Sequence, residues 1–287
     1  MKTYLGIDVG SVSTKLVVLD DGQELLAHSY LPTLGNPVAA LKKGLAQIQE
    51  QLPPSISIAR VSTTGSAREL AGALVGADLI KNEVTSQATA SRHYFPEVHT
   101  VIEIGGQDSK IIIMRDGLVV DFGMNTVCAA GTGSFLDHQS QRLNLTPAEF
   151  GTMALKSQAP AEIAGKCTVF AESDMIHRQQ SGARLEDIVY GLCRTLVHNY
   201  LNSVAAGKDI QPPVVFQGGL AFNRGIVRAF EEELGTELII PEHPELMGAI
   251  GVALLAQPEI SNKPSRFKGF ETSRLDFDPS TFECQML

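Results

Sequence analysis

One pattern of residues occurs twice in this sequence, at a constant offset of 95 positions. Residues 7–22 and 102–117 each contain an apolar strand that delivers an acid, a glycine turn and a second apolar strand. The matched residues are Asp8 with Glu103, Gly10 with Gly105, Lys15 with Lys110, and Gly22 with Gly117. Each copy is therefore predicted to form a β-hairpin, and the chain to contain two similar halves.

The residue types in the two hairpins favour one kind of ligand. Glycine turns let the backbone approach a ligand closely and leave N–H groups free to bind phosphate. The acids and lysines beside the turns can hold a metal ion and balance charge. Two such hairpins facing one ligand predict a duplicated, two-domain nucleotide clamp.

Composition supports this interpretation and argues against a nucleic-acid partner. A chain of 287 residues is long enough for two domains with full cores, and 44% hydrophobic with 19% charged residues is typical of a soluble globular protein. The net charge of −9 and the pI of about 5.3 argue against a nucleic-acid partner, because phosphate neutralisation needs a basic surface. Backbone N–H groups, a metal ion and one or two lysines would have to bind phosphate instead.

The sequence also predicts that the protein is cytoplasmic and does not bind a membrane. The segment from Met1 runs directly into a strand without a signal-peptide core, and the apolar run 247–256 is too short to span a bilayer. The four cysteines are widely spread: Cys128, Cys167, Cys193 and Cys284. Reduced thiols in this compartment suit metal binding better than disulfides.

The apolar periodicity divides the chain into elements of two α/β domains. The first domain is predicted to span residues 1–97 and to be completed by 244–287, and the second to span 98–243. Around the hairpins, the predicted helices are 37–52, 67–74, 133–143, 170–180, 185–206, 223–234 and 244–256. The other predicted strands are 58–65, 117–123, 213–219 and 237–240, with a mixed segment up to Tyr94 and no structure assigned after Pro258.

Three strand-to-glycine turns occur in order, at Gly10-Ser11, Gly105-Gly106 and Gly218-Gly219. They resemble the phosphate-1, phosphate-2 and adenosine motifs of the actin, hexokinase and Hsp70 ATPase superfamily. The resemblance implies an α/β fold of two ribonuclease-H-like (actin-like ATPase) domains with ATP in the cleft between them. The plainer alternative is that the glycines only form tight turns.

The superfamily resemblance also implies roles for individual residues. Backbone groups at Gly10, Ser11, Ser13, Thr14, Gly105, Gly106 and Gln107 would hold the phosphates, with Lys15 as their cationic partner. Asp8 and Asp108 would hold Mg²⁺ through water, and Gly218, Gly219 and Asn223 would border adenosine. Glu103, Gln107 and Asp108 are the candidate catalytic residues, since Glu103 and Gln107 could orient the attacking water. Each of these acids, and Gln107, could instead serve only the geometry of its turn.

Two cysteines stand just before predicted helices, in Cys128-Ala-Ala-Gly-Thr-Gly133 and in Lys166-Cys-Thr-Val-Phe-Ala-Glu-Ser-Asp174. A helix N-terminus stabilises a thiolate through its dipole and its free N–H groups. Two cysteines make half of a four-cysteine cluster site, and a C₂ homodimer would supply the same pair from the other chain. Judged by spacing alone, buried inert thiols remain the alternative.

The sequence around these cysteines resembles that of one protein family. Ile104-Gly-Gly-Gln-Asp-Ser-Lys110, residues 125–133 and Cys167-Thr-Val-Phe-Ala-Glu-Ser173 are similar to the activator proteins of 2-hydroxyacyl-CoA dehydratases, which have related ATPase subunits in benzoyl-CoA reductases. The resemblance covers about residues 3–257. It implies a homodimer with one [4Fe–4S] cluster held by Cys128 and Cys167 of each chain. ATP would drive one electron, supplied by a ferredoxin or flavodoxin, onto a low-potential iron–sulfur partner protein.

Two other functions remain open at this point. The chain could be a sugar or carboxylate kinase of the same superfamily with structural cysteines, or a non-redox nucleotide switch in the manner of Hsp70. The electron acceptor also stays open among a 2-hydroxyacyl-CoA dehydratase, an aryl-CoA reductase and another cluster protein. Cys193 lies on the apolar face of a predicted helix and is expected to be a plain core residue.

Overall fold

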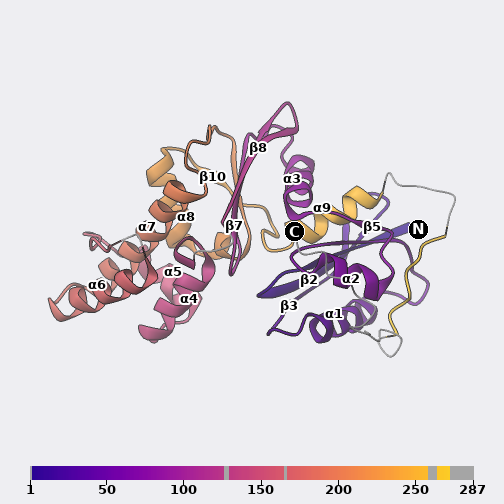
Figure 1. The fold of residues 1–287 in the computed structure, drawn as a ribbon, viewed down its shortest axis with the longest axis horizontal. Coiled ribbons are helices and arrows are strands. Elements are labelled where there is room, and N and C mark those ends of the chain that lie inside the picture. Colours follow the sequence, from indigo (N-terminus) through magenta and orange to yellow (C-terminus); the bar gives the residue numbers. More distant parts are fainter. Residues whose placement is uncertain (1, 126–128, 165–166, 258–263, 272–287) are drawn as a thin grey trace. The chain divides into compact units, whose positions relative to one another are not determined.

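The computed structural model describes residues 2–125, 129–164, 167–257 and 264–271. The chain divides into two compact units. The first contains the residues up to Tyr94 together with those from Leu246 onward, and the second is Phe95–Glu245. Each unit is built on one five-stranded sheet (Figure 1).

The sheet of the first unit has the order β3-β2-β1-β4-β5. Its strands are β1 (Lys2–Val9), β2 (Ser13–Asp20), β3 (Leu25–Pro32), β4 (Ser57–Thr64) and β5 (Leu79–Ile80). β1 and β2 form the predicted first hairpin, and β4 runs parallel to β1 on its other side. β1 is therefore the central strand, and its carboxyl end carries Asp8 into the first glycine turn.

Helices cover both faces of this sheet. They are α1 (Pro37–Gln51), α2 (Arg68–Val75), α3 (Glu83–Tyr94) and α9 (Met247–Ala256). Because strand side chains alternate between faces, Leu5 and Ile7 pack in one core with α1 and α2, whereas Tyr4 packs with α3 and α9 in another. Gly6 lies on the α9 face, where an added β-carbon would fall 2.1 Å from Ala249 O. Glycine thus allows α9 to lie directly on the backbone of β1.

The second unit repeats this arrangement with a larger helical layer. Its sheet order β8-β7-β6-β9-β10 matches the order of the first sheet. The strands are β6 (Thr100–Ile104), β7 (Ser109–Arg115), β8 (Leu118–Asn125), β9 (Val214–Gln217) and β10 (Leu238–Ile239). β6 and β7 form the predicted second hairpin, and β9 runs parallel to β6.

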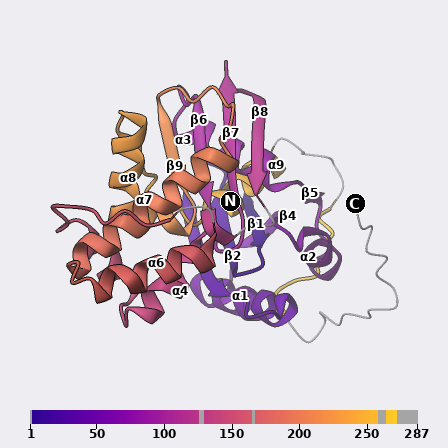
Figure 2. The ribbon, with the colours of Figure 1, turned by 60° about the vertical axis from the view of Figure 1, so that its left-hand side comes forward.

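The helical elements of the second unit gather beside its sheet, as Figure 2 shows. They are η1 (Ala129–Gly131), α4 (Gly133–Arg142), α5 (Pro147–Ala154), α6 (Thr168–Gln180), α7 (Leu185–Ser203), η2 (Gly219–Phe222) and α8 (Arg224–Leu234). One core joins Ile102 and Ile104 of β6 with Ile188, Leu192 and Leu196 along the apolar stripe of α7. The hairpin of this unit therefore packs against α7, the longest helix in the described part of the chain.

Most predicted elements are confirmed, and a few differ. α3 occupies the segment whose structure was predicted only as mixed, and neither β3 nor α5 was predicted. The segment 264–271 has no helix or strand, yet Phe267 and Phe270 pack on the core of the first unit and Lys268 N donates to Val75 O. Within the described ranges, no helix is both long enough and apolar enough to cross a bilayer.

Candidate functional site

The two hairpins match in their pairing as well as in their sequence. Asp8 lies opposite Lys15 in the β1–β2 register, and Glu103 lies opposite Lys110 in the β6–β7 register. Each turn closes through the same backbone hydrogen bond, from Gly10 N to Ser13 O and from Gly105 N to Asp108 O, both of 3.0 Å. These two amide groups serve the turns themselves. The acid and the lysine of each copy are thus brought together across a glycine turn.

In the first unit, the carboxylate of Asp8 is enclosed on several sides. Lys15 Nζ lies 3.3 Å from Asp8 Oδ2, and little of the aspartate is exposed. A β-carbon at Gly65 would lie 2.5 Å from Asp8 Oδ1, and one at Gly248 would lie 2.8 Å from Asp8 Oδ2. Two glycines from distant parts of the sequence therefore make room for this one carboxylate.

The loop after Asp8 is held by several hydrogen bonds. Thr33 Oγ1 donates to Gly10 O at 2.8 Å and lies 3.0 Å from Thr14 Oγ1. Ala67 N donates to Val9 O at 3.0 Å. The side chain of Ser11 remains exposed, whereas Ser13 is half-buried and Thr14 is buried. The predicted phosphate residues thus form a fixed turn with Ser11 at its outer side.

In the second unit, Lys110 joins two carboxylates. Lys110 Nζ donates to Glu103 Oε2 at 3.0 Å and to Asp108 Oδ2 at 2.7 Å. Burial acts to lower the pKa of Lys110, but attraction to Glu103 and Asp108 outweighs it and raises this pKa well above its ordinary value. The lysine therefore stays protonated although its side chain is only 3% exposed. Gln107 is exposed on the same turn.

The third glycine turn lies against the second hairpin. Gly218 has a φ of +89°, and a β-carbon there would lie 2.4 Å from Ile104 O and 3.0 Å from Glu103 Oε1. Gly219 is exposed just after it. Asn223 caps α8, since its Oδ1 accepts from Gly225 N at 3.0 Å and from Ile226 N at 3.2 Å. Predicted residues of two separate motifs therefore meet within the second unit.

The start of α4 is hydrogen-bonded to the second turn. Gly133 N donates to Gly105 O at 2.9 Å, and Ser134 N donates to Gly106 O at 2.8 Å. A β-carbon at Gly133 would lie 2.9 Å from Gly105 O. A helix was predicted here, but its contact with the turn was not. The glycine at the first helical position could have indicated that another segment approaches closely. Any displacement of the turn therefore acts directly on the first residues of α4.

The described part of the chain contains one of the two predicted cluster ligands. Cys167 is the half-buried residue that precedes α6, and the next turn exposes the apolar side chains of Val169 and Phe170. Cys128 and Cys284 lie outside the described residues. Cys193 is fully buried on α7 in the core of the second unit, as predicted, and burial raises the pKa of its thiol.

Two of the described residues fit the cofactors that the sequence implies. Among all the described residues, no three His, Cys, Asp or Glu side chains converge on one metal position. Cys167 fits a cluster ligand, because its accessible thiol stands at a helix N-terminus. Asp108 fits a metal ligand, because the absence of a β-carbon at Gly105 keeps the space beside Asp108 Oδ1 open.

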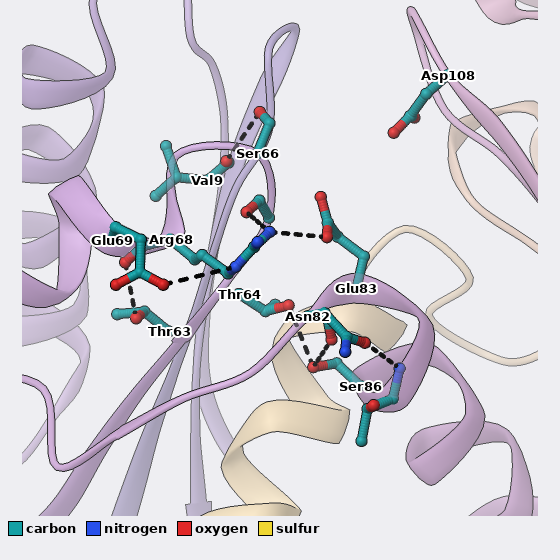
Figure 3. A network of polar contacts seen from close by, with 12 residues as sticks. Val9, Thr63, Thr64, Ser66, Arg68, Glu69, Asn82, Glu83, Ser86 and Asp108 are labelled. Carbon is teal, nitrogen blue, oxygen red and sulfur yellow. Dashed lines mark hydrogen bonds and ion pairs between the residues drawn. The ribbon is translucent and has the colours of Figure 1, made fainter. Parts of the chain in front are cut away.

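Sequence reasoning did not anticipate a polar network beside the first turn, which Figure 3 shows. Arg68 Nη1 donates to Gly65 O at 3.3 Å and to Glu83 Oε2 at 3.1 Å. Ser86 Oγ donates to Thr64 Oγ1 at 3.1 Å, and Thr64 lies beside Asp8 in the β1–β4 register. Two features of the sequence could have indicated this network. Arg68 comes just after the Gly65 turn, and Glu83 comes just after Asn82, which caps α3.

The fold and the two hairpins define the chain as an actin-like ATPase. Two sheets of equal strand order, each with a hairpin that closes on a glycine turn, are the shared framework of this class. The chain belongs to the BadF/BadG/BcrA/BcrD ATPase family, which it matches over residues 5–256. ATP binding and hydrolysis follow from this membership. The resemblance and the fold class predicted from the sequence are both confirmed.

Relatives and solved structures agree with this assignment. The chain is 35% identical to the 2-hydroxyisocaproyl-CoA dehydratase activator of Clostridioides difficile, with 92% of this chain and 98% of the relative covered. It is 36% identical to the (R)-2-hydroxyglutaryl-CoA dehydratase activating ATPase of Acidaminococcus fermentans, with 88% and 96% covered. The structure of the activator of the 2-hydroxyisocaproyl-CoA dehydratase from Clostridium difficile with bound ADPNP matches with a TM-score of 0.80, covering 90% of this chain and 95% of that one.

Proposed function

We propose that this protein is an ATP-dependent one-electron donor that activates a low-potential iron–sulfur enzyme, such as a 2-hydroxyacyl-CoA dehydratase. The support from the comparisons is that two relatives with near-complete coverage carry the names of dehydratase activators. Two identical chains would share one [4Fe–4S] cluster, held by Cys128 and Cys167 of each chain. A ferredoxin or flavodoxin would supply the electron, and the cytoplasm is the proposed compartment.

The proposed roles of the nucleotide-binding residues follow the two hairpins. Gly10, Ser11, Ser13 and Thr14 would contact phosphate through their loop with help from Lys15, and Gly105, Gly106 and Gln107 through theirs. Asp8 and Asp108 would hold Mg²⁺ through water, and Glu103 and Gln107 would orient the attacking water. Gly218, Gly219 and Asn223 would border adenosine. The two ATPase domains would span 1–97 with 244–287, and 98–243.

The observation that carries the proposal is the contact between the second turn and α4. Gly105 O and Gly106 O accept hydrogen bonds from the first two residues of α4. This helix follows the Cys128 segment, so a nucleotide that contacts the turn can act on the backbone beside a cluster ligand. A ligand shifts such an equilibrium only if it binds the two states with different affinity. ATP and ADP differ by the γ-phosphate that the turn would contact, which supplies this difference.

Iron analysis of anaerobically purified protein tests the proposal. The shared cluster predicts about four iron atoms per dimer, and Cys128→Ser or Cys167→Ser should remove this iron together with its visible absorption. Cys193→Ser is the matched control, because its buried thiol is a core residue of α7. Four irons per chain, or iron retained in both ligand variants, would contradict a shared site.

A further inference from the structure

The two glycine turns differ in the charged group that lies nearest to them. A β-carbon at Gly10 would lie 3.1 Å from Ser13 O and 3.8 Å from Lys15 Nζ, with no carboxylate oxygen within 4 Å. A β-carbon at Gly105 would instead lie 2.8 Å from Asp108 Oδ1 and 3.5 Å from Glu103 Oε1. The first turn therefore has an ammonium group beside it, and the second has two carboxylates, although the two hairpins match in sequence.

One substitution between the copies explains this difference. At the offset of 95 residues, Ser13 stands where the second copy has Asp108. In the first copy Lys15 forms an ion pair with Asp8, and in the second Lys110 forms ion pairs with both Glu103 and Asp108. The side chain of Lys15 is 16% exposed, whereas Lys110 is almost completely covered. Lys110 thus lies covered between two acids, whereas Lys15 keeps part of its surface exposed beside Asp8.

We infer that Lys110 is a positioning residue, which holds Asp108 and Glu103 in the arrangement that metal-dependent ATP hydrolysis needs, while Lys15 alone serves phosphate. This inference rests on the proposed function, since it assigns the metal to Asp108 and the attacking water to Glu103. The two matching lysines then have different roles: Lys15 binds phosphate, and Lys110 positions carboxylates. Lys110 acts through the carboxylates and does not touch the nucleotide.

The geometry around Lys110 supports this role. Its ammonium binds Asp108 Oδ2, and the other oxygen, Asp108 Oδ1, faces the space at Gly105. One oxygen is thereby fixed and the other is presented at the turn. The backbone of Lys110 is held as well, because Tyr200 OH donates to Lys110 O at 2.7 Å from the buried face of α7. Such partners of metal-binding carboxylates set their orientation.

The test compares Lys110→Met with Lys15→Met, the same change at the matching position of the other hairpin. For Lys110→Met we expect kcat for ATP hydrolysis to fall about 10- to 100-fold and half-saturation by Mg²⁺ to need a similarly higher concentration. Its affinity for ADP without metal should stay within about three-fold of the wild type, because no phosphate contact is lost. In Lys15→Met the main loss should instead be in ADP affinity, which should be about ten-fold weaker than in the wild type.

A double-variant cycle shows whether Lys110 acts through Asp108. Once Asp108→Asn is present, adding Lys110→Met should change kcat and the Mg²⁺ requirement by less than about three-fold, because the carboxylate it positions is gone. Lys110→Arg keeps a cation that can join two carboxylates and should recover at least part of the lost kcat. Additive losses in the cycle would overturn the inference.

The design remains decisive if Lys110→Met alone does not fold. Asp108→Asn with Lys110→Met removes one of the two acids together with the cation, and its ADP affinity can be compared with that of Asp108→Asn. A loss of about ten-fold or more at this step would show that Lys110 contacts the nucleotide and would overturn the inference. If the wild-type protein hydrolyses ATP but donates no electron, the proposed function fails while this test still stands.

Discussion

Arg68, the first residue of α2, donates a 3.1 Å hydrogen bond to the carboxylate of Glu83, the first residue of α3. The same guanidinium group donates to Gly65 O in the turn beside Asp8. α3 is also the last element of the first unit before the chain enters the second at Phe95. The ion pair therefore connects the loop next to the first hairpin with the helix that leads out of its unit.

Glu83→Gln should lower the melting temperature by up to about 4 °C, because a partly exposed ion pair contributes about 0.2–1 kcal/mol. Glu69→Gln is the matched control, since Glu69 Oε1 lies 3.8 Å from Arg68 Nε and its side chain is largely exposed. Thermal unfolding followed by circular dichroism measures both. An equal shift in the two variants would show that Arg68 has no preference for Glu83.

Gly218→Ala should destabilise the protein by about 1–3 kcal/mol and reduce ATP turnover. Its φ of +89° is unfavourable for alanine, and the new methyl group would meet Ile104 O and Glu103 Oε1. Gly235→Ala is the control, because Gly235 has a φ of +66° but no atom within 4 Å of the added β-carbon. Urea unfolding measures the loss of stability in both variants, and steady-state hydrolysis measures the loss of turnover. If both variants lost turnover equally, the contact with Ile104 O and Glu103 Oε1 would not be its cause.

The hairpins could be predicted because short-range signals determine them. Apolar alternation marks the strands and glycine marks each turn. The pairing of Glu103 with Lys110 also follows from the turn, because residues equally distant from its ends lie opposite each other. α5 had a recognisable start as well, with Thr146 and Glu149 forming a capping box around Pro147.

Other features depend on tertiary contacts that local sequence does not encode. α3 has weak apolar periodicity and several polar or β-branched residues, and it is stabilised instead by close packing on α9. A β-carbon at Gly251 would lie 1.8 Å from Ser86 O, which shows how closely the two helices approach. The enclosure of Asp8 by Gly65 and Gly248 joins segments far apart in the chain, and single-sequence patterns contain no signal for it.

Asp187→Ala should reduce the free energy of unfolding at neutral pH by about 1–3 kcal/mol. Asp187 Oδ1 accepts from Ala159 N at 3.0 Å, Ser157 Oγ at 2.7 Å and Gln158 N at 3.0 Å, and thereby holds the chain between α5 and α6. The alanine variant leaves these donors without their acceptor. Urea unfolding measures the loss, with Glu50→Gln at an exposed position of α1 as the control.

The same carboxylate predicts a pH dependence. The hydrogen bonds from Ala159 N and Ser157 Oγ hold the pKa of Asp187 below its ordinary value of 3.8. A folded-state pKa below the unfolded one gives stability that is present above pH 3.8 and is lost as the pH falls through the folded value. The stability difference between wild type and Asp187→Ala should therefore shrink in acid below that pH. A difference that grew on acidification would contradict the assignment.

Gly133→Ala should weaken the coupling between nucleotide and α4. The added methyl group would press on Gly105 O and on Leu220, so the helix start would move away from the turn. Ser134→Ala is the milder variant, because it removes the side-chain bond to Gly106 O but keeps both backbone bonds. We expect ATP turnover to fall about ten-fold or more in Gly133→Ala and less in Ser134→Ala. Iron content and chromatography under anaerobic conditions control for loss of the proposed dimer and its cluster.

The central claim, that ATP acts on a cluster held between two chains, is tested most directly by the rate at which an iron chelator removes iron. Anaerobic protein is compared with ADP, with ADPNP and without nucleotide. Because coupling between sites typically changes an equilibrium by about 5- to 150-fold, extraction should be at least about five-fold faster with ADPNP than with ADP. Equal extraction rates in all three conditions would contradict the coupling and leave an ATPase whose iron–sulfur centre does not respond to its nucleotide.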